Sequence, residues 1–400
     1  MTNVYAALEI GTTRTLLAIG EAEADGRLKI SCLSEIPSTG VKKSQILDIN
    51  QAVQSVKSVL REAERTHPDL SIGNAFLVVS GQHIVADPAV GTVQIAGNKV
   101  SEEDIADVSE SARSMPLPKD RELLDIVDRD YELDNLGGIS APKGMTGRIL
   151  KLNVLNVHAD SNRIQDARNA AGTAHLAIRE PLFAATCAAD AVLEEHERRN
   201  GVLVLDLGGG STGYSVYSDG TLVTAGVIGV GGDHITNDIA HAFQTTQAQA
   251  EQLKTTEASA VVSRNNARPP RVKMPGKTPM MDSRSISRLA LDTVVNARLR
   301  EMISIIREKL ESRDLLHRLH AGVVLTGGGA AMRDIDLLVH RELGASVRPG
   351  RPIHVDGLEE VANPPSFAAI AGALLYAHNN YAEKPIFDFG KINILKGLFK

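Results

Sequence analysis

Two stretches in opposite halves of the chain share one layout, and this internal repeat constrains the fold more than any other feature. The first reads VYAALEIGTTR (4–14) and the second reads VLVLDLGGGST (202–212). Each stretch is a short apolar run, an acidic residue, and a turn of Gly and hydroxyl residues, and another apolar run follows. Third apolar runs at 28–36 and 221–228 extend both copies in the same way. We therefore expect a duplicated α/β domain with a cleft between the copies.

Regular elements are expected after each copy. Apolar spacing and turn signals predict a helix at 50–65 capped by Asn50, a strand at 76–80, a helix at 234–243, a strand at 321–326 and a helix at 330–338. The strand at 321–326 ends in three consecutive glycines, and the predicted helix follows them directly.

Two insertions interrupt the duplicated cores. Residues 83–160 predict a small α+β subdomain with short strands at 91–95 and 150–157 and a helix opened by Ser101 and Asp104, a pair that resembles a capping box. Residues 255–285 are rich in Pro, Arg and Lys and predict irregular hairpins or loops, closed by a helix at about 285–310. The expected domains are a first core (1–82 and 161–195), the first insertion (83–160), a second core (196–232 and 311–379), the second insertion (233–310), and a linker with a C-terminal tail (380–400).

Composition excludes several classes of protein. Apolar residues make up 43% and charged residues 23% of the 400 residues, as in an ordinary globular chain. A net charge of −6 and an aromatic content of 3% argue against nucleic acid as a partner. Two cysteines argue against a disulfide scaffold, and no apolar run reaches the ~20 residues that span a bilayer. The N-terminus reads as a strand, not a signal peptide, so a cytoplasmic body is expected.

The Gly-rich turns have a direct chemical use. Backbone N–H groups of such a turn point into one concavity and can bind phosphate oxygens, and glycine allows a close approach. An acidic residue before the turn suits Mg²⁺ held through water. Two facing hairpins could clamp the phosphates of a nucleotide, and the turn at 327–329 precedes a predicted helix whose N-terminus favours an anion. The chain contains no G-x-x-x-x-G-K-[ST] motif, so it is not a P-loop protein.

These motifs resemble the actin/Hsp70/sugar-kinase superfamily. LEIGTTRT resembles its first phosphate loop, LDLGGGST its second and VVLTGGGAAM its adenosine motif. Residues 184–191 and 365–375 resemble the two small-residue helices that cross between its domains. Over the whole chain the sequence is most similar to the bacterial FtsA family of division proteins. That similarity includes Glu at position 9, the stretches VSGQHI (79–84) and GVGGDHITNDIAHAF (229–243), and the place of the first insertion. The resemblance implies an actin-like fold made of ribonuclease-H-type domains.

The resemblance also implies an ATP site with Mg²⁺. Glu9 and Asp206 would hold Mg²⁺ through water. The residues that would line the nucleotide are Gly11, Thr12, Thr13, Arg14, Gly208, Gly209, Gly210, Ser211, Thr212, Gly231, Gly232, Asp233, Glu251, Lys254, Gly327, Gly328, Gly329 and Met332. For Lys254 the alternative is a solvated helix residue, and for Arg14 it is a surface charge.

Hydrolysis would need a group that orients the attacking water. Glu180 lies where Hsp70-like relatives carry a glutamate near that water, and its alternative role is a helix N-terminal residue stabilised by the macrodipole. We expect ATP binding with slow or undetectable hydrolysis.

The last ten residues, KINILKGLFK, form a basic amphipathic pattern. At helical spacing five apolar side chains fall within an arc of ~160°, a pattern suited to an anionic membrane surface. FtsA-like proteins use such a tail as a membrane anchor, which predicts a peripheral protein on the cytoplasmic face of the inner membrane at the division site. The alternative is a helix docked on the protein's own body. The expected membrane-contacting residues are Ile392, Ile394, Leu395, Lys396, Leu398, Phe399 and Lys400.

The resemblance further implies protein partners. Arg284 and Arg298, with Glu301, match the residues by which FtsA proteins hold the C-terminal peptide of FtsZ, and their alternative role is a solvated helix face. The first insertion would be a surface for self-assembly into filaments and for other division proteins. A pilus-machinery scaffold and a small-molecule kinase or phosphatase on the same fold are the alternative functions. Neither explains the amphipathic tail, and the chain is too short to be an Hsp70 chaperone.

Overall fold

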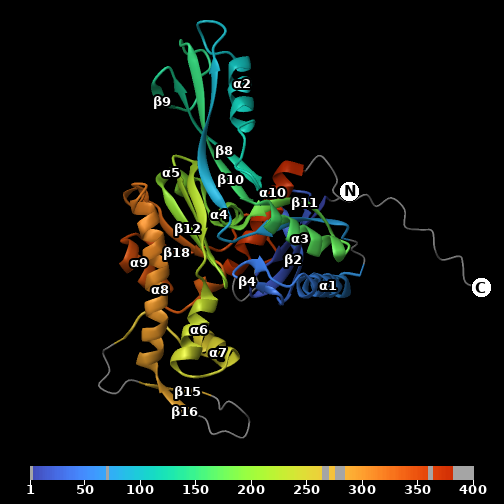
Figure 1. The fold of residues 1–400 in the computed structure, drawn as a ribbon, viewed down its shortest axis with the longest axis vertical. Helices are drawn as coiled ribbons and strands as arrows, with labels where there is room; N and C mark the ends of the chain where they lie inside the picture. Colours follow the sequence, from blue (N-terminus) through green and yellow to red (C-terminus); the bar gives the residue numbers. More distant parts are fainter. Residues whose placement is uncertain (1–2, 69–71, 264–269, 275–283, 359–363, 382–400) are drawn as a thin grey trace, which may run out of the picture.

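The computed structural model describes residues 3–68, 72–263, 270–274, 284–358 and 364–381. The described chain forms two α/β halves side by side, with one insertion at the top of the view and another at the bottom (Figure 1). A large mixed sheet lies in each half, and the strands of the two repeated motifs lie inside these sheets and not at their edges.

The first sheet has the strand order β11-β6-β1-β2-β3-β19. Its strands are β1 (Val4–Ile10), β2 (Arg14–Ala22), β3 (Leu28–Pro37), β6 (Asn74–Val79), β11 (Ala177–Phe183) and β19 (Val355–Asp356). Strand β1 is antiparallel to β2 and parallel to β6. Helices α1 (Ile49–Thr66) and α3 (Ser161–Thr173) pack beside it, and the hairpin β4 (Val41–Lys42)–β5 (Gln45–Ile46) precedes α1.

The second sheet begins with the strand order β18-β17-β12-β13-β14. Its strands are β12 (Val202–Leu207), β13 (Thr212–Ser218), β14 (Thr221–Ile228), β17 (Gly322–Thr326) and β18 (Val347–Pro349). The two halves share one strand order, β3-β2-β1-β6-β11 in the first and β14-β13-β12-β17-β18 in the second. In each half the first three of these strands pair antiparallel, and the last two are parallel to the strand before them. The sequence repeat is therefore a repeat of topology, and the predicted duplicated α/β fold is confirmed.

Successive side chains of β12 point to opposite faces of the second sheet, and each face packs against a different core cluster. Val202 and Val204 belong to the large core cluster that also fills the first half, whereas Leu203, Leu205 and Leu207 belong to a second cluster under the helices of the other face. Those helices are α6 (Gly232–Ala242), α7 (Gln247–Thr256), α8 (Arg288–Glu311) and α9 (Ile335–Leu343), with the short 3₁₀ turns η1 (Leu316–Arg318) and η2 (Gly328–Ala331). The short helix α5 (Glu195–Asn200) contacts β13 on the side of the large cluster, where Arg198 lies 4.5 Å from the centre of the Tyr217 ring.

Two helices of small residues cross between the halves. Helix α4 (Ala184–Val192) follows the first half's β11 but contacts β12 and β13, whereas α10 (Ala368–Tyr381), which follows the turn η3 (Pro364–Phe367), contacts β1 and β2. At the crossing a Cβ on Gly372 would overlap the carbonyl oxygen of Cys187. Each half thus contributes a helix to the other half's sheet.

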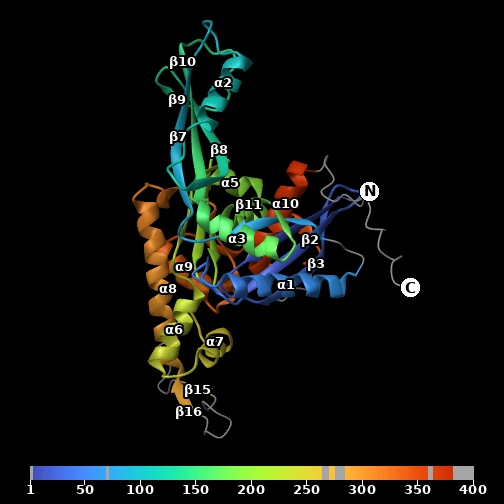
Figure 2. The same cartoon turned by 45° about the vertical axis from the view of Figure 1, so that its right-hand side comes forward.

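The first insertion forms a sheet with one helix. It contains β7 (Val85–Gln94), α2 (Glu102–Arg113), β8 (Arg121–Leu133), β9 (Leu136–Ile139) and β10 (Ile149–Asp160). Ser101 caps α2, and its backbone N–H donates to the carboxylate of Asp104, so the expected capping box is present. Figure 2 shows these strands rising above the two halves. They continue the second sheet, because Val85 of β7 pairs with Gly226 of β14.

Several expected bounds are wrong. Asp48, not Asn50, caps α1, because its carboxylate accepts the N–H of Gln51. The strands of the first insertion run longer than expected, and sequence spacing missed β8 and β9, whose residues alternate weakly. In place of the helix expected at 330–338, the chain forms the turn η2 and then α9. Asp334, the residue before α9, adopts a left-handed backbone conformation (φ 61°). In the second insertion Arg284 lies in β16 (Arg284–Ser287), paired with β15 (Arg271–Met274), and not in the helix.

Candidate functional site

A cleft of about 590 Å³ separates the two halves, and both Gly-rich hairpins line it. The hairpin turns have the same local geometry. A Cβ on Gly11 would lie 2.8 Å from the carbonyl oxygen of Arg14, and a Cβ on Gly208 would lie 2.8 Å from that of Ser211. Both turns therefore require glycine at the equivalent position, two residues after the acidic residue.

The two hairpins also face each other closely. A Cβ on Gly209 would overlap the hydroxyl of Thr13, and one on Gly210 would overlap the hydroxyl of Thr12. The second hairpin rests on α6, where the N–H groups of Gly232 and Asp233 donate to the carbonyls of Gly208 (2.9 Å) and Gly209 (2.8 Å). This arrangement leaves bare backbone on both sides of the cleft, the surface that a phosphate chain can approach.

Glu9 and Asp206 end equivalent strands and both line the cleft. Burial, together with the negative charge of Glu9, raises the pKa of Asp206 to about 7 against the opposing effect of Arg14. Burial also raises the pKa of Glu9, again opposed by Arg14. Two carboxylates that repel each other beside bare backbone form a donor set that fits a hard cation such as Mg²⁺.

Arg14 lines the cleft but its guanidinium is already engaged. It pairs with Glu35 at 2.7 Å, donates to the carbonyl of Ser366 and lies 4.5 Å from the centre of the Phe367 ring. These contacts tie β2 of the first half to the turn that precedes α10. Arg14 is therefore neither a solvated surface charge nor a free phosphate ligand in this arrangement.

The wall formed by α6 and α7 holds a buried cation. The side chain of Lys254 is 11% exposed, and its ammonium pairs with Glu251 at 2.7 Å. It also donates to the hydroxyl of Thr236 at 2.9 Å and to the carbonyl of Gly232 at 3.2 Å. The alternative of a solvated helix residue is therefore wrong for Lys254.

The third Gly-rich turn closes the opposite wall. Gly327 has φ 78°, and a Cβ there would lie 2.5 Å from a carboxylate oxygen of Asp206. Gly328, Gly329 and Met332 line the cleft beside it. The turn continues into η2 rather than into a regular helix, so the expected helix N-terminus is not formed at this point.

Most of the expected nucleotide-lining residues meet in this one cleft, but two do not line it. Thr212 is buried and its hydroxyl donates to the carbonyl of Val230, and Gly231 packs behind the carbonyls of Gly208 and Gly209. Both residues shape the second hairpin from behind. Sequence reasoning missed other lining residues, which are Ile10, Glu35, Ser44, Val78, Ser80, Leu207, Ile235, Thr255, Leu299, Met302, Ala331, Ser366, Phe367 and Ala369. Leu299 and Met302 have the spacing of ordinary core residues of α8, so their sequence carried no separate signal.

Glu180 lies outside the cleft lining. It belongs to β11 at a register shift between Ile178 and Pro181, and its carboxylate hydrogen-bonds the hydroxyl of Tyr376 on α10. Its side chain faces α10 and not the cleft, so a role in orienting an attacking water gains no support from this geometry and stays a prediction. The alternative of a helix N-terminal residue is wrong, since α4 begins only at Ala184.

The basic residues of the second insertion differ in availability. Arg298 makes a bidentate pair with Asp238 of α6 (2.6 and 3.0 Å) and a second pair with Glu301 (2.6 Å). Arg284 is exposed, and among the described residues it makes only long polar contacts, to the carbonyl of Gln244 (3.4 Å) and the sulfur of Met274 (3.9 Å). Arg284 is thus the more accessible of the two cations.

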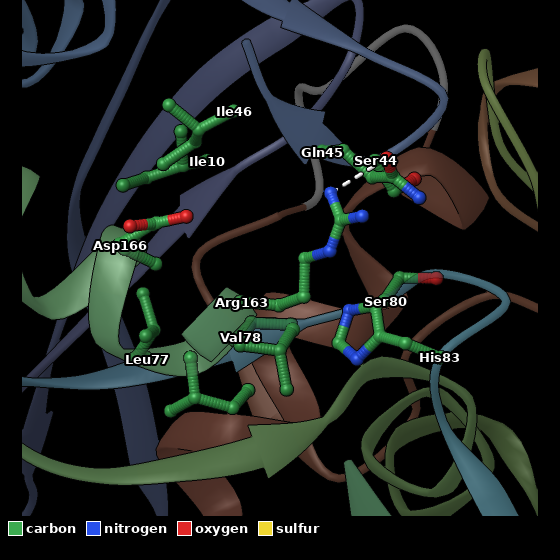
Figure 3. Close-up of a pocket in the computed structure, with 13 residues that line it drawn as sticks. Ile10, Ser44, Gln45, Ile46, Leu77, Val78, Ser80, His83, Arg163 and Asp166 are labelled. Carbon is green, nitrogen blue, oxygen red and sulfur yellow. Dashed lines mark hydrogen bonds between the residues drawn. The ribbon is translucent and has the colours of Figure 1, made fainter. Parts of the chain in front are cut away.

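A smaller cavity of about 40 Å³ adjoins the cleft and shares Ser44 and Ser80 with it. In Figure 3 the guanidinium of Arg163, from α3, points toward Gln45 of the β4–β5 hairpin, with a hydrogen bond of 2.6 Å. Burial, aided by the nearby charge of Arg163, lowers the pKa of His83 in this cavity to about 4.

The expected tail residues lie outside the described residues, so their contacts are not part of the structure. In the part of the chain that is described, no helix has the length and apolarity to cross a bilayer.

Comparison with known proteins identifies the family. The sequence model described as "Cell division protein FtsA" matches residues 203–372, and the model "SHS2 domain inserted in FTSA" matches residues 81–158. Cell division protein FtsA of Escherichia coli K12 is 30% identical over 387 residues, 94% of this chain and 90% of its own. The FtsA protein of Pseudomonas aeruginosa is 32% identical over 371 residues, 92% of this chain and 88% of its own. The chain belongs to the FtsA family.

Solved structures agree with this FtsA family member in fold. A PilM–PilN type IV pilus biogenesis complex matches with a TM-score of 0.63 at 19% identity, over 93% of this chain and 98% of that chain. MreB5 of Spiroplasma citri bound to ADP matches with a TM-score of 0.52 at 15% identity, over 95% and 99% of the two chains. The fold is therefore actin-like with an inserted subdomain, and the protein is an actin-like member of a family of cell division proteins.

Proposed function

We propose that this FtsA family member binds Mg²⁺-ATP in the cleft, polymerises on the cytoplasmic membrane and attaches the FtsZ ring to it, where later division proteins join. The observation that carries the proposal is the cleft itself, in which two matching Gly-rich hairpins, each preceded by a carboxylate, face one another. MreB5, whose structure is described as bound to ADP, has the same fold. Purified protein that binds no ATP in isothermal titration calorimetry would contradict the proposal.

The site supports binding more than catalysis. Glu9 and Asp206 would hold Mg²⁺ through water, and the Mg²⁺ would neutralise the charge of the phosphates. Among the described residues that line the cleft, the carboxylates are Glu9, Glu35, Asp206, Asp233 and Glu251. Glu35 and Glu251 are already paired with Arg14 and Lys254. We propose that hydrolysis is slow, and a turnover comparable to that of sugar kinases would contradict this.

Membrane attachment is proposed from the tail at 391–400. Three lysines and five apolar residues support weak, reversible binding by one chain, so several chains in a filament would bind together more tightly. The test is co-sedimentation of the full chain, and of a chain lacking residues 390–400, with vesicles containing anionic lipid. We expect the deletion to release the protein, and unchanged sedimentation would contradict the assignment.

The FtsZ contact is proposed at the exposed end of the second insertion. An arginine suits the carboxylates of an acidic peptide. Arg284 is exposed, as are Arg271 and Lys273 of the paired strand, whereas Arg298 is held by Asp238. Arg284→Glu is expected to abolish a pull-down with the FtsZ C-terminal peptide without altering stability. Arg300→Glu is the matched control, since Arg300 lies on α8 and pairs with Glu342. Undiminished binding by Arg284→Glu would contradict the proposal.

A further inference from the structure

The β4–β5 hairpin lies outside all three Gly-rich motifs, yet its tip touches both phosphate loops. The N–H of Ser44 donates to the hydroxyl of Thr12 in the first loop at 2.8 Å. The hydroxyl of Ser44 lies 2.9 Å from that of Ser211 in the second loop. Ser44 also lines the cleft. One residue at a hairpin tip therefore connects the two halves of the molecule.

The neighbouring residue packs against the second loop as well. A Cβ on Gly210 would lie 2.9 Å from the Cα of Lys43. The hairpin backbone thus sits against bare backbone of the other half, and any side chain at position 210 would push it away. The contact between Lys43 and Gly210 exists only while the two phosphate loops lie as close together as they do in this structure.

The base of the hairpin is fixed to the first half. Val41 and Ile46 pack on a small core made by Ala52, Val53 and Ala170. Gln45 accepts a hydrogen bond from Arg163 of α3, as Figure 3 shows. The base of the hairpin is anchored in the first half and its tip contacts the second half. The contact at the tip therefore depends on the relative position of the two halves.

The backbone conformation of the hairpin turn does not explain why position 44 carries a serine side chain. Lys43 and Ser44 have φ values of 50° and 58°, in the left-handed region that favours glycine. A glycine at position 44 would form the same turn with less strain. The serine hydroxyl is therefore explained by its contact across the cleft and not by the hairpin.

We propose that Ser44 is a nucleotide-positioning residue, which ties the first phosphate loop to the second and so holds both loops against the phosphates of one ATP. This inference rests on the proposed ATP binding. Loss of the hydroxyl leaves each loop intact but removes the shorter of two hydroxyl contacts to Ser211 from the first half, the other being that of Ser80 at 3.4 Å. ATP affinity therefore falls while the folded body is retained.

The first test compares ATP affinity in two variants by calorimetry. Ser44→Gly removes the hydroxyl and relieves the turn, so we expect ATP binding to weaken about 3- to 10-fold with no fall in the melting temperature of the nucleotide-free protein. Ser38→Ala is the matched control, because its hydroxyl bonds Thr15 at 2.7 Å and it does not line the cleft. We expect its ATP affinity to match that of the wild type.

The second test uses trypsin, since Lys42 and Lys43 are exposed at the hairpin tip. ATP is expected to slow cleavage there in the wild type but much less in Ser44→Gly, with cleavage after the exposed Lys119 as internal standard. Wild-type ATP affinity and equal ATP protection in Ser44→Gly would overturn this inference alone. Absence of ATP binding by the wild type would overturn the proposed function and this inference with it.

Discussion

Lys254 shows how one buried side chain can organise a wall of the cleft. Its ammonium joins α7, which carries it, to Thr236 and to the backbone of Gly232 at the start of α6. Gly232 in turn supports the second phosphate loop through the carbonyl of Gly208. The lysine therefore acts on the phosphate loop through α6, besides placing a positive charge in the cleft.

Replacement of this lysine should separate its role from that of an exposed lysine. Lys254→Met removes the charge and leaves the Glu251 carboxylate with the Thr236 hydroxyl (2.5 Å) but without its cationic partner, at a cost of about 1–3 kcal/mol. We expect ATP affinity to fall about tenfold, measured by calorimetry. Lys309→Met, at an exposed position of α8, should bind ATP like the wild type. Equal affinities for both variants would contradict this role.

His83 predicts a pH dependence of stability. Burial lowers its pKa in the folded state to about 4, below the unfolded value of 6.5. The unfolded chain therefore takes up a proton as the pH falls below 6.5, while the folded chain does so only near pH 4, and stability is lost across this window. Between pH 7.5 and pH 5 this group should contribute a loss of about 1–2 kcal/mol.

The variant His83→Asn should lack this contribution. Denaturant unfolding at pH 7.5 and pH 5 measures it as a difference between the wild type and the variant. His317→Asn, at an exposed histidine, should retain the wild-type dependence. The same pH dependence in His83→Asn and the wild type would show that the imidazole titrates normally in the folded state.

At the scale of elements, the crossing of α4 and α10 is the closest packing between the halves. A Cβ on Gly372 would meet backbone atoms of Cys187, which cannot move aside as a side chain can. Gly372→Ala should therefore destabilise the protein by about 3 kcal/mol, measured by urea unfolding.

A second glycine provides the control for this substitution. Gly172 lies in the last turn of α3 with no atom within 4 Å of an added Cβ. Gly172→Ala should leave stability unchanged or raise it by up to about 1 kcal/mol. Similar stabilities for the two variants would contradict this prediction, because they would show that α4 and α10 can move apart to accommodate the methyl group without loss of free energy of unfolding.

Element types were predictable where the pattern was local and strong. The strand expected at 221–228 coincides with β14, because its residues are mostly apolar and a turn precedes it. The helix expected at 330–338 failed because Asp334 adopts a left-handed conformation and bonds Ser259, a residue far away in sequence (2.6 Å). The pairing of β7 with β14 could not be predicted from the sequence either, because it joins the first insertion to the sheet of the second half.

At the scale of the whole molecule, ATP should bind the two halves together as one unit. At about 100 times its dissociation constant, a ligand that binds only the folded state raises the free energy of unfolding by about 2.7 kcal/mol. We expect Mg²⁺-ATP to raise the melting temperature accordingly, and removal of Mg²⁺ by a chelator to reduce the shift, because Glu9 and Asp206 would then repel the phosphates. An equal shift with and without Mg²⁺ would contradict the metal site.

The repeat of strand, carboxylate and Gly-rich turn determined the fold class and the location of the cleft, because local spacing specifies strands and tight turns and duplication specifies their arrangement. The family resemblance supplied the expected lining residues, and all of them except Thr212 and Gly231 line the cleft. Only the tertiary structure decided that Glu180 faces Tyr376, that Arg14 and Arg298 are already paired, and that Ser44 bridges the loops. Those contacts join residues distant in the chain, and a side chain's partner across a cleft depends on packing that no local pattern encodes.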